Sequence, residues 1–576
     1  MSSLFYYLKP YRLSIGLFLL LMLSGIMLEL YLPTLMANMV DIGIVNEDLD
    51  DVLRIGGWML VCSVFAVGLS VGVNFLSSSV AHGFGKDLRY SLFVHVQKFS
   101  LEQFERFGTD SLMTRTTNDI RQVQDFINAL FGIMTRAPIM LLGGILLAVY
   151  RDSALSIIFL AVIPILAGTI FLIMRRAVPL YGLIQKQTDR LNLIVRESLS
   201  GIRVIRAFGR EAHDKQRFLE ANQDYRDLGI RVNKITAFLF PTINIVMSMT
   251  NITIIWFAGI RINAGQMQVG NLMAFLQYAM MILVSLIMMS LTFVMIPRAQ
   301  ASARRIAEVL RLEPAIIDAG NEQLGADRKG HIEFKEVSFR YTDAANPALR
   351  SISFEAKPGE TTAIIGSTGS GKTTLLQLIA RLYEVDEGSI LIDGTDIREF
   401  SQRSLRSCIG YVTQQAHLFR GTIADNVTFG QPMLEPVQME EVLQTAMALD
   451  FVQSKDGAME AEVAQGGSNF SGGQKQRLSI ARALARKPSI FLFDDSFSAL
   501  DYKTDAQLRA RLKQMTRNAT ILIVAQRIST VQDADQIIVL HEGEIVGIGT
   551  HSELLVSNGI YQEIVASQLA KEEVGA

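Results

Sequence analysis

Six long stretches in the first half of the chain are almost entirely apolar. Each has roughly 20 residues or more, which is enough for a helix to cross about 30 Å of hydrocarbon. The pattern therefore predicts six membrane-spanning helices. They cover residues 14–36, 55–80, 127–150, 154–174, 237–260 and 272–296.

The connections between these stretches differ in length and in charge. The long connections, residues 81–126 and 175–236, contain many lysines and arginines, and their apolar periodicity predicts helices that extend beyond the bilayer and turn near residues 108–119 and 200–211. The positive-inside rule places both long connections and both termini in the cytoplasm of a multi-pass protein of the cell membrane. The first short connection carries Asp41, Glu47, Asp48, Asp50 and Asp51.

After residue 297 the apolar stretches give way to a charged segment, residues 298–330, and then to alternating strand and helix signals. Residues 331–340 alternate between apolar and polar, while residues 361–365, 520–525 and 536–540 are short apolar runs. We therefore expect a multidomain membrane protein. A transmembrane domain (1–297) and a linker (298–330) precede an α/β domain (331–576) with a parallel core sheet.

Composition narrows the function classes. With 49% hydrophobic residues in 576 and a mean hydropathy of +0.28, part of the chain must lie in lipid. The net charge of −2 gives no general attraction to nucleic acid, so we expect no nucleic-acid partner. The two cysteines, Cys62 and Cys408, support neither a disulfide framework nor a cysteine metal site. The N-terminal apolar run lacks a small-residue cleavage site, so we expect it to remain as a membrane anchor.

A glycine-rich loop follows the apolar run 361–365 and opens a helix at Thr374. In this context the pattern is a phosphate loop, in which backbone N–H groups bind the phosphates of ATP, the lysine reaches the β- and γ-phosphates and the last threonine binds Mg²⁺. Asp494, at the end of the apolar stretch from Ser489, is a second Mg²⁺ ligand in this interpretation. The nucleotide-binding residues of this loop and of the helix start are Gly366, Ser367, Thr368, Gly369, Ser370, Gly371, Lys372, Thr373 and Thr374.

The segment from Asn469 to Arg477, with the phosphate loop, Asp494 and the run from Ser498 to Asp501, resembles the signature of ATP-binding-cassette (ABC) proteins. Six spans followed by one cassette resemble an exporter half-transporter over essentially the whole chain. The resemblance implies that the cassette works only as a pair. The signature residues then cap the γ-phosphate held by the opposite subunit, through Ser471, Gly472, Gly473 and Gln474.

The same resemblance implies roles for other residues. Gln414 contacts Mg²⁺ and the membrane domain, Tyr341 stacks on adenine, and Asp501 crosses the dimer interface. From the residues alone, a tyrosine at position 341 more often packs in the core or in a turn. Residues 461–463 correspond to an exporter-specific stretch that meets a long connection.

Two positions depart from the family pattern. Asp495 stands where the family has a glutamate that polarises the attacking water, and Gln526 stands where it has a histidine. Aspartate is one methylene shorter, and a neutral amide cannot carry imidazolium charge or relay a proton. The chain thus resembles the degenerate-site subunit of a bacterial heterodimeric multidrug exporter, which binds ATP and hydrolyses it poorly alone. The alternative is tolerated drift in a symmetric enzyme.

In the membrane half, Glu29 is an ionisable residue in the first span, and such a residue is by default a candidate for a functional role. It can bind a cationic substrate or proton, or instead lie near the outer interface or pair with Arg136. Met280 and Met288, in the methionine-rich last span, are candidate substrate contacts, with core or lipid-facing packing as the alternative.

These features predict ATP-driven export of apolar or amphipathic compounds. The alternatives are a homodimeric lipid or peptide exporter, and a nucleotide-binding regulatory subunit with no transport path of its own. Six complete spans argue against the regulatory subunit.

Overall fold

The computed structural model describes residues 4–292, 295–316, 318, 329–342, 344–431 and 433–574. Its described residues form two compact units. One comprises Met1–Val96 and Asp110–Leu312, and the other comprises Gln97–Thr109 and Glu313–Ala576.

Within the described residues, unit 1 contains six helical stretches that are long and apolar enough to cross a membrane, which confirms the predicted spans. Helices α2 (Leu49–Val96) and α7 (Ser153–Ser200) have 48 residues each. At about 1.5 Å per residue each is about 72 Å long. The hydrocarbon core is about 30 Å thick, so these helices extend beyond the bilayer, as predicted.

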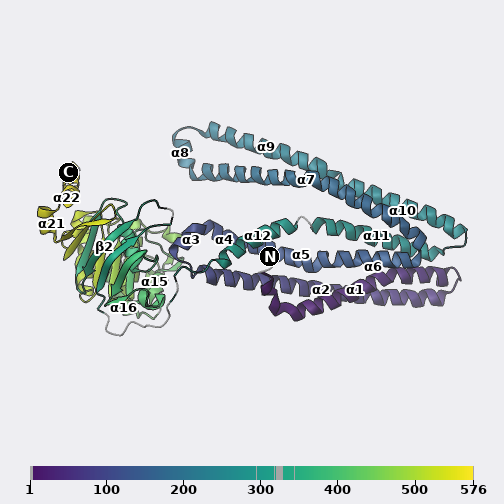
Figure 1. Cartoon of the computed structure of the whole chain (residues 1–576), viewed down its shortest axis with the longest axis horizontal. Coiled ribbons are helices and arrows are strands. Elements are labelled where there is room, and N and C mark those ends of the chain that lie inside the picture. The colour runs from purple at the N-terminus through teal and green to yellow at the C-terminus, as the bar shows by residue number, and fades with distance from the viewer. Residues whose placement is uncertain are drawn as a thin grey trace. The chain divides into compact units, whose positions relative to one another are not determined.

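The remaining elements of unit 1 complete an all-helical bundle, in which α7 lies beside α9 and α10 with the short helix α8 at the tip (Figure 1). The 3-10 helix η1 precedes α1 and the π-helical turn η2 follows it, while the π-helical turns η3 and η4 lie between consecutive helices. The bounds are η1 Leu4–Tyr11, α1 Arg12–Asn38, η2 Met39–Ile44, α4 Thr109–Thr114, η3 Arg115–Asp119, α5 Ile120–Ala129, η4 Leu130–Met134, α6 Thr135–Arg151, α8 Ile202–Ala207, α9 Glu211–Ala237, α10 Leu239–Asn263, α11 Val269–Thr292 and α12 Met295–Arg311.

Helix α11 packs one face against α1 and α6. Phe275, Tyr278 and Ile282, spaced three or four residues apart, are buried in this core. The Tyr278 hydroxyl donates to the Leu30 carbonyl at 3.1 Å and lies 2.8 Å from Thr34 Oγ1. This packing orders the inner part of unit 1.

One predicted turn is wrong. The turn that we expected near residues 108–119 lies about ten residues earlier, because Ser100 and Gln103 form a capping box that starts helix α3 (Leu101–Phe107). Gly108, at φ 73°, ends α3, and residues 109–119 are helical again. The second turn, at α8, is confirmed within residues 200–211.

Helix α12 occupies residues that the composition indicated as linker. Ala299, Ser302, Ala303 and Ile306 bury one face of this helix, so residues 298–311 pack as part of unit 1. Residues 317 and 319–328 of the predicted linker lie outside the described residues. The boundaries at 297 and 331 stay a prediction.

Unit 2 contains two main sheets. The core sheet has the order β12-β11-β3-β10-β9-β6, in which β12 alone runs antiparallel, and this confirms the predicted parallel core. The second sheet is antiparallel, in the order β2-β1-β4-β5, and β7 pairs with β8. The strands are β1 Ile332–Phe339, β2 Leu349–Ala356, β3 Thr361–Gly366, β4 Glu387–Ile392, β5 Thr395–Asp396, β6 Ile409–Val412, β7 Gly421–Thr422, β8 Glu462–Val463, β9 Ile490–Asp494, β10 Thr520–Val524, β11 Gln536–His541 and β12 Glu544–Gly549.

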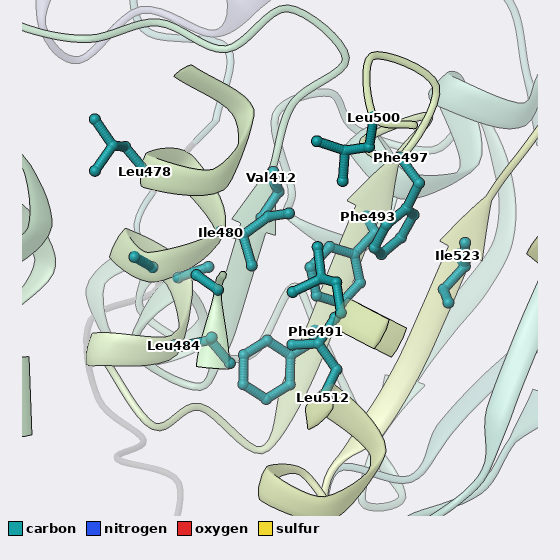
Figure 2. Close-up of a cluster of buried hydrophobic side chains, with 14 of the residues drawn as sticks. Val412, Leu478, Ile480, Leu484, Phe491, Phe493, Phe497, Leu500, Leu512 and Ile523 are labelled. Carbon is teal, nitrogen blue, oxygen red and sulfur yellow. The ribbon is translucent and has the colours of Figure 1, made fainter. Parts of the chain in front are cut away.

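Helices cover one face of the core sheet, and α13 with the antiparallel sheet covers the other, so its strands are apolar on both sides. Phe491 and Phe493 of β9 enter the core that Figure 2 shows, together with Ile480 of α18, while Leu492 enters the core on the opposite face. The helices are α13 Lys372–Ile379, α14 Gln402–Ser407, α15 Ile423–Val427, η5 Thr428–Gly430, α16 Pro436–Thr445, α17 Leu449–Gln453, η6 Ala458–Glu460, η7 Gln465–Gly467, α18 Gly472–Ala485, α19 Tyr502–Met515, α20 Ile528–Val531, α21 His551–Ser557 and α22 Gly559–Val574.

Candidate functional site

Sheet order brings the predicted nucleotide residues together. In the core sheet β3, β10, β9 and β6 are neighbours in that order, and the carboxyl ends of parallel strands meet at one edge. Gly366 ends β3 and Asp494 ends β9, while Gln526 and Gln414 follow β10 and β6 by two residues. Four segments that are distant in the sequence thus converge on one site.

The phosphate loop has the backbone that its glycines allow. Gly371, at φ 100°, precedes α13, and a Cβ there would come within 2.7 Å of the Ala348 carbonyl oxygen. Lys372 is buried and donates from Nζ to the carbonyl oxygens of Gly366 at 2.9 Å and Ser367 at 2.7 Å. Burial lowers the pKa of Lys372, and the nearby Asp495 and Asp494 oppose that shift.

The residues of the phosphate loop fit a bound nucleoside triphosphate. The Ser370 hydroxyl is buried and has no hydrogen-bond partner among the described residues, so it is a donor available to a phosphate oxygen. Lys372 supplies a cation, and the first backbone N–H groups of α13 have no partner in their own helix. The exposed residues Ser367, Thr368 and Gly369 form the outer turn of the loop.

Asp494 and Thr373 are the residues that fit Mg²⁺. The Thr373 hydroxyl donates to Asp494 Oδ1 at 2.9 Å, and the Tyr411 hydroxyl lies 3.5 Å from Oδ2. Asp494 is 2% exposed, and burial raises its pKa. In the described part of the chain no group of three His, Cys, Asp or Glu side chains could hold a metal. A carboxylate and a hydroxyl are sufficient where phosphates supply further oxygen ligands, as is usual for Mg²⁺.

Asp495 lies between two amide side chains. Gln526 Nε2 donates to Asp495 Oδ2 at 2.9 Å, and Gln414 Nε2 lies 3.5 Å from the same oxygen. Asp495 is 8% exposed with a backbone φ of 47°, and burial raises the pKa of its carboxyl group. The two positions that depart from the family pattern are therefore in direct contact. Gln414, which the resemblance implies is an Mg²⁺ contact, is directed here at Asp495.

Tyr341 lies beside the phosphate loop. Its hydroxyl is 2.8 Å from Thr374 Oγ1. Its ring makes edge-to-face contacts with the rings of Phe339 and Tyr383, at centroid separations of 4.9 Å and 5.4 Å. The ring is half-buried, so part of it is accessible to a base. Core packing holds this ring next to the loop that it would serve.

The signature motif begins a helix at the surface. Ser471 caps α18 by accepting from Gln474 N at 3.3 Å, and Gln474 Oε1 accepts from Ser471 N at 3.0 Å. Ser471 and Gly472 are exposed, and a Cβ at Gly473 would lie 3.2 Å from the Ala499 carbonyl oxygen. The N-terminus of α18 is thus open to a ligand from outside this cassette.

Asp501 caps its own helix. Its carboxylate accepts from Thr504 N and Thr504 Oγ1, each at 2.8 Å, and these bonds lower its pKa. A contact across a dimer interface would have to share this carboxylate with α19.

Sequence reasoning missed the tyrosines around the site. Tyr411 approaches Asp494, and the Tyr383 hydroxyl donates to Glu105 Oε2 of α3 at 3.1 Å. The Leu101 N–H of α3 also donates to the Leu382 carbonyl at 3.3 Å. The Ser-x-x-Gln box at Ser100 was the available signal for α3. Helix α3 therefore packs on the residues that support Tyr341.

In unit 1 the structure answers one open alternative. Arg136 Nη2 donates to both carboxylate oxygens of Glu29 at 2.7 Å, which is the pairing considered from the sequence. Met280 and Met288 of α11 are 50% and 41% exposed, respectively, so they lie outside the α1–α6–α11 core. Their role as substrate contacts stays a prediction.

Comparison with known proteins identifies both halves. Residues 15–286 match the family of ABC transporter transmembrane regions, and residues 349–498 match the ABC transporter family. An uncharacterized ABC transporter ATP-binding protein of Mycobacterium tuberculosis (strain CDC 1551 / Oshkosh) is 42% identical over 573 residues, covering 99% of this chain and 98% of that protein. An ATP-dependent lipid A-core flippase of Syntrophus aciditrophicus (strain SB) is 32% identical over 509 residues, with 88% and 84% covered.

The fold also matches a solved structure. A bacterial Atm1-family ABC exporter with ATP bound superposes with a TM-score of 0.81 at 24% identity, covering 97% of this chain and 98% of that one. The chain therefore belongs to the ABC transporter family, as a transport ATPase with the exporter fold in which one transmembrane region precedes one ATP-binding cassette.

Proposed function

We propose that this chain is one subunit of a heterodimeric exporter that uses ATP to move apolar or amphipathic compounds of the multidrug type out of the cell. Its own ATP site, with Mg²⁺ held by Asp494 and Thr373, is impaired in hydrolysis. Its signature motif completes the competent site of a second half-transporter. The chain crosses the cell membrane with both termini in the cytoplasm.

The contact between Gln526 and Asp495 carries this proposal. A catalytic carboxylate must reach the water that attacks the γ-phosphate, whereas Asp495 is one methylene short and accepts from Gln526 at 2.9 Å. A positional error of about 1 Å can cost about a hundredfold in rate. Phosphoryl transfer depends mainly on positioning and charge stabilisation, and both are weakened here. The phosphate loop around Lys372 keeps the features needed to hold ATP.

The exposed signature motif supports a partner with a complete site. Ser471 and its glycines present a helix N-terminus, and an anion is stabilised at such an end by backbone N–H groups and the helix dipole. Ser471, Gly472 and Gly473 match the family signature, unlike Asp495 and Gln526. A partner with glutamate and histidine at the two altered positions would bind ATP against this motif and hydrolyse it.

The experiment is to measure ATPase activity of the purified chain alone and together with such a partner. We expect negligible turnover alone, because a homodimer places Asp495 and Gln526 in both composite sites, and clear turnover of the pair. Activity of the isolated chain within a few-fold of the complex would contradict the proposal.

A homodimeric lipid exporter is the second candidate, supported by the similarity to a protein named as a lipid A-core flippase. The same ATPase experiment separates the two, since a homodimeric exporter must hydrolyse ATP by itself. A purely regulatory subunit is disfavoured, because such a subunit would not need six membrane-spanning helices.

A further inference from the structure

The ion pair between Glu29 and Arg136 lies within the spanning part of the bundle. Helix α1 continues directly as η2, so Glu29 is fifteen residues before the end of this continuous helix at Ile44, and Arg136 is likewise fifteen residues before the end of α6 at Arg151. At about 1.5 Å per residue both offsets are about 23 Å. The two residues therefore lie at about the same depth, inside helical stretches long and apolar enough to cross a hydrocarbon layer about 30 Å thick.

Both charges are partly uncovered. The Arg136 side chain is 46% exposed and the Glu29 side chain is 26% exposed. Among the described residues the structure gives neither side chain another ion-pair partner. Charges at this depth are costly against lipid tails, and charged residues in spanning helices almost always face the bundle interior or a water-filled cavity. The pair is thus placed to border the transport path.

The hydrogen bonding leaves donors for a ligand. Glu29 engages only Nη2 of Arg136, so Nε and Nη1 have no partner among the described residues. The guanidinium is suited to phosphate and carboxylate groups. One turn away, Leu32 on α1, Ile133 on η4 and Ile139 on α6 are half-buried or exposed, so apolar surface adjoins the pair.

The charge balance selects among headgroups. The two charges sum to zero, so a purely anionic group on Arg136 would be repelled by Glu29, and a purely cationic group on Glu29 would be repelled by Arg136. A headgroup with both signs satisfies both residues. We propose that Glu29 and Arg136 bind the zwitterionic headgroup of an amphipathic compound, with its anion on Arg136, its cation on Glu29 and its tail on the adjoining apolar surface. This inference rests on the proposed export of amphipathic compounds and names their headgroup class.

The test uses three photoactivatable amphiphiles with one alkyl chain and different headgroups: phosphocholine, trimethylammonium and sulfate. Each is applied to membranes containing the full-length chain, without ATP, and labelled peptides of α1 and α6 are quantified by mass spectrometry. We expect the phosphocholine amphiphile to label these peptides about fivefold more than the other two amphiphiles do. A preference of this size corresponds to the contribution of one partly exposed ion pair to binding.

Two variants must then reverse the preference in opposite directions. Glu29→Gln leaves a lone cation and should favour sulfate, whereas Arg136→Gln leaves a lone anion and should favour trimethylammonium. The exchange Glu29→Arg with Arg136→Glu restores a neutral pair and should restore the phosphocholine preference, which guards against misfolding of the single variants. Arg261→Gln, which breaks the 3.0 Å pair with Asp152 elsewhere in unit 1, is the matched control and should change nothing.

Equal labelling of the wild type by all three headgroups, or equal loss of all labelling in both single variants, would overturn the inference. Because labelling is measured without ATP, this outcome is independent of the hydrolysis experiment. Failure of the heterodimer proposal would leave the headgroup preference unchanged.

Discussion

Replacing Asp495 by glutamate and Gln526 by histidine together should make the impaired site hydrolyse ATP. The Asp495 carboxylate now accepts from Gln526 at 2.9 Å. Glutamate extends the carboxylate by about 1 Å, a displacement that can change the rate about a hundredfold. The histidine removes the amide that holds the carboxylate and can contact the γ-phosphate.

The single substitutions should achieve much less. Asp495→Glu alone drives the longer carboxylate into the Gln526 amide at a position that is only 8% exposed. Gln526→His alone leaves Asp495 too short. A hydrogen bond to a charged group contributes about 1.5–3 kcal/mol. The double-mutant cycle should therefore be non-additive by about 1.5 kcal/mol or more, which is about tenfold in rate.

The assay is nucleotide retention after rapid gel filtration of the complex, with hydrolysis assigned to each subunit in parallel. The native complex should retain slowly exchanging ATP on this chain, so that the two cassettes stay partly engaged between cycles, and the double variant should lose it. Gln532→His with Asp533→Glu, the same changes at exposed positions, is the control. If the native complex shows no preferential retention here and the double variant alters neither retention nor transport, Asp495 is a sufficient base and the asymmetric-site mechanism is wrong.

Three further predictions concern the nucleotide residues. Lys372→Ala should abolish ATP photolabelling of this chain, because it removes the buried cation of the phosphate loop. The control is Lys475→Ala, which removes a lysine outside that loop whose Nζ donates to the Gly466 carbonyl oxygen at 2.9 Å, and it should leave the labelling intact. Unchanged labelling in Lys372→Ala would refute the assignment. Ser471→Arg should reduce ATPase activity of the complex more than any change at Asp495, since it obstructs the partner's competent site, and equal losses would mean that both sites hydrolyse. Burial raises the pKa of Asp494 above the ordinary carboxyl pKa of 3.8, and protonation of Asp494 removes an Mg²⁺ ligand. On acidification, Mg²⁺-dependent ATP binding to this chain should therefore begin to fall while the pH is still above 3.8. Binding that stays constant down to pH 3.8 would argue against this role.

Most elements followed from local patterns. The six spans, the phosphate loop and the apolar strands of the core sheet lie where hydropathy and glycine spacing placed them. The errors arose where a local signal was missed or overridden. The capping box at Ser100 moved the first turn, and α12 packs a charged segment into unit 1 because its apolar residues recur on one face. Helix α18 begins at Gly472 because Ser471 supplies the cap.

The sequence by itself determined the fold class, the nucleotide chemistry and the two altered positions, since each depends on residues that are neighbours along the chain. Only the tertiary structure decided which distant side chains meet. Asp495 and Gln526 are 31 residues apart and touch because β9 and β10 are adjacent parallel strands, while Glu29 and Arg136 are 107 residues apart and pair because α1 packs on α6. Hydropathy and turn signals report burial and local geometry. They do not report strand order or which helix faces pack together, and these set the contacts on which function depends.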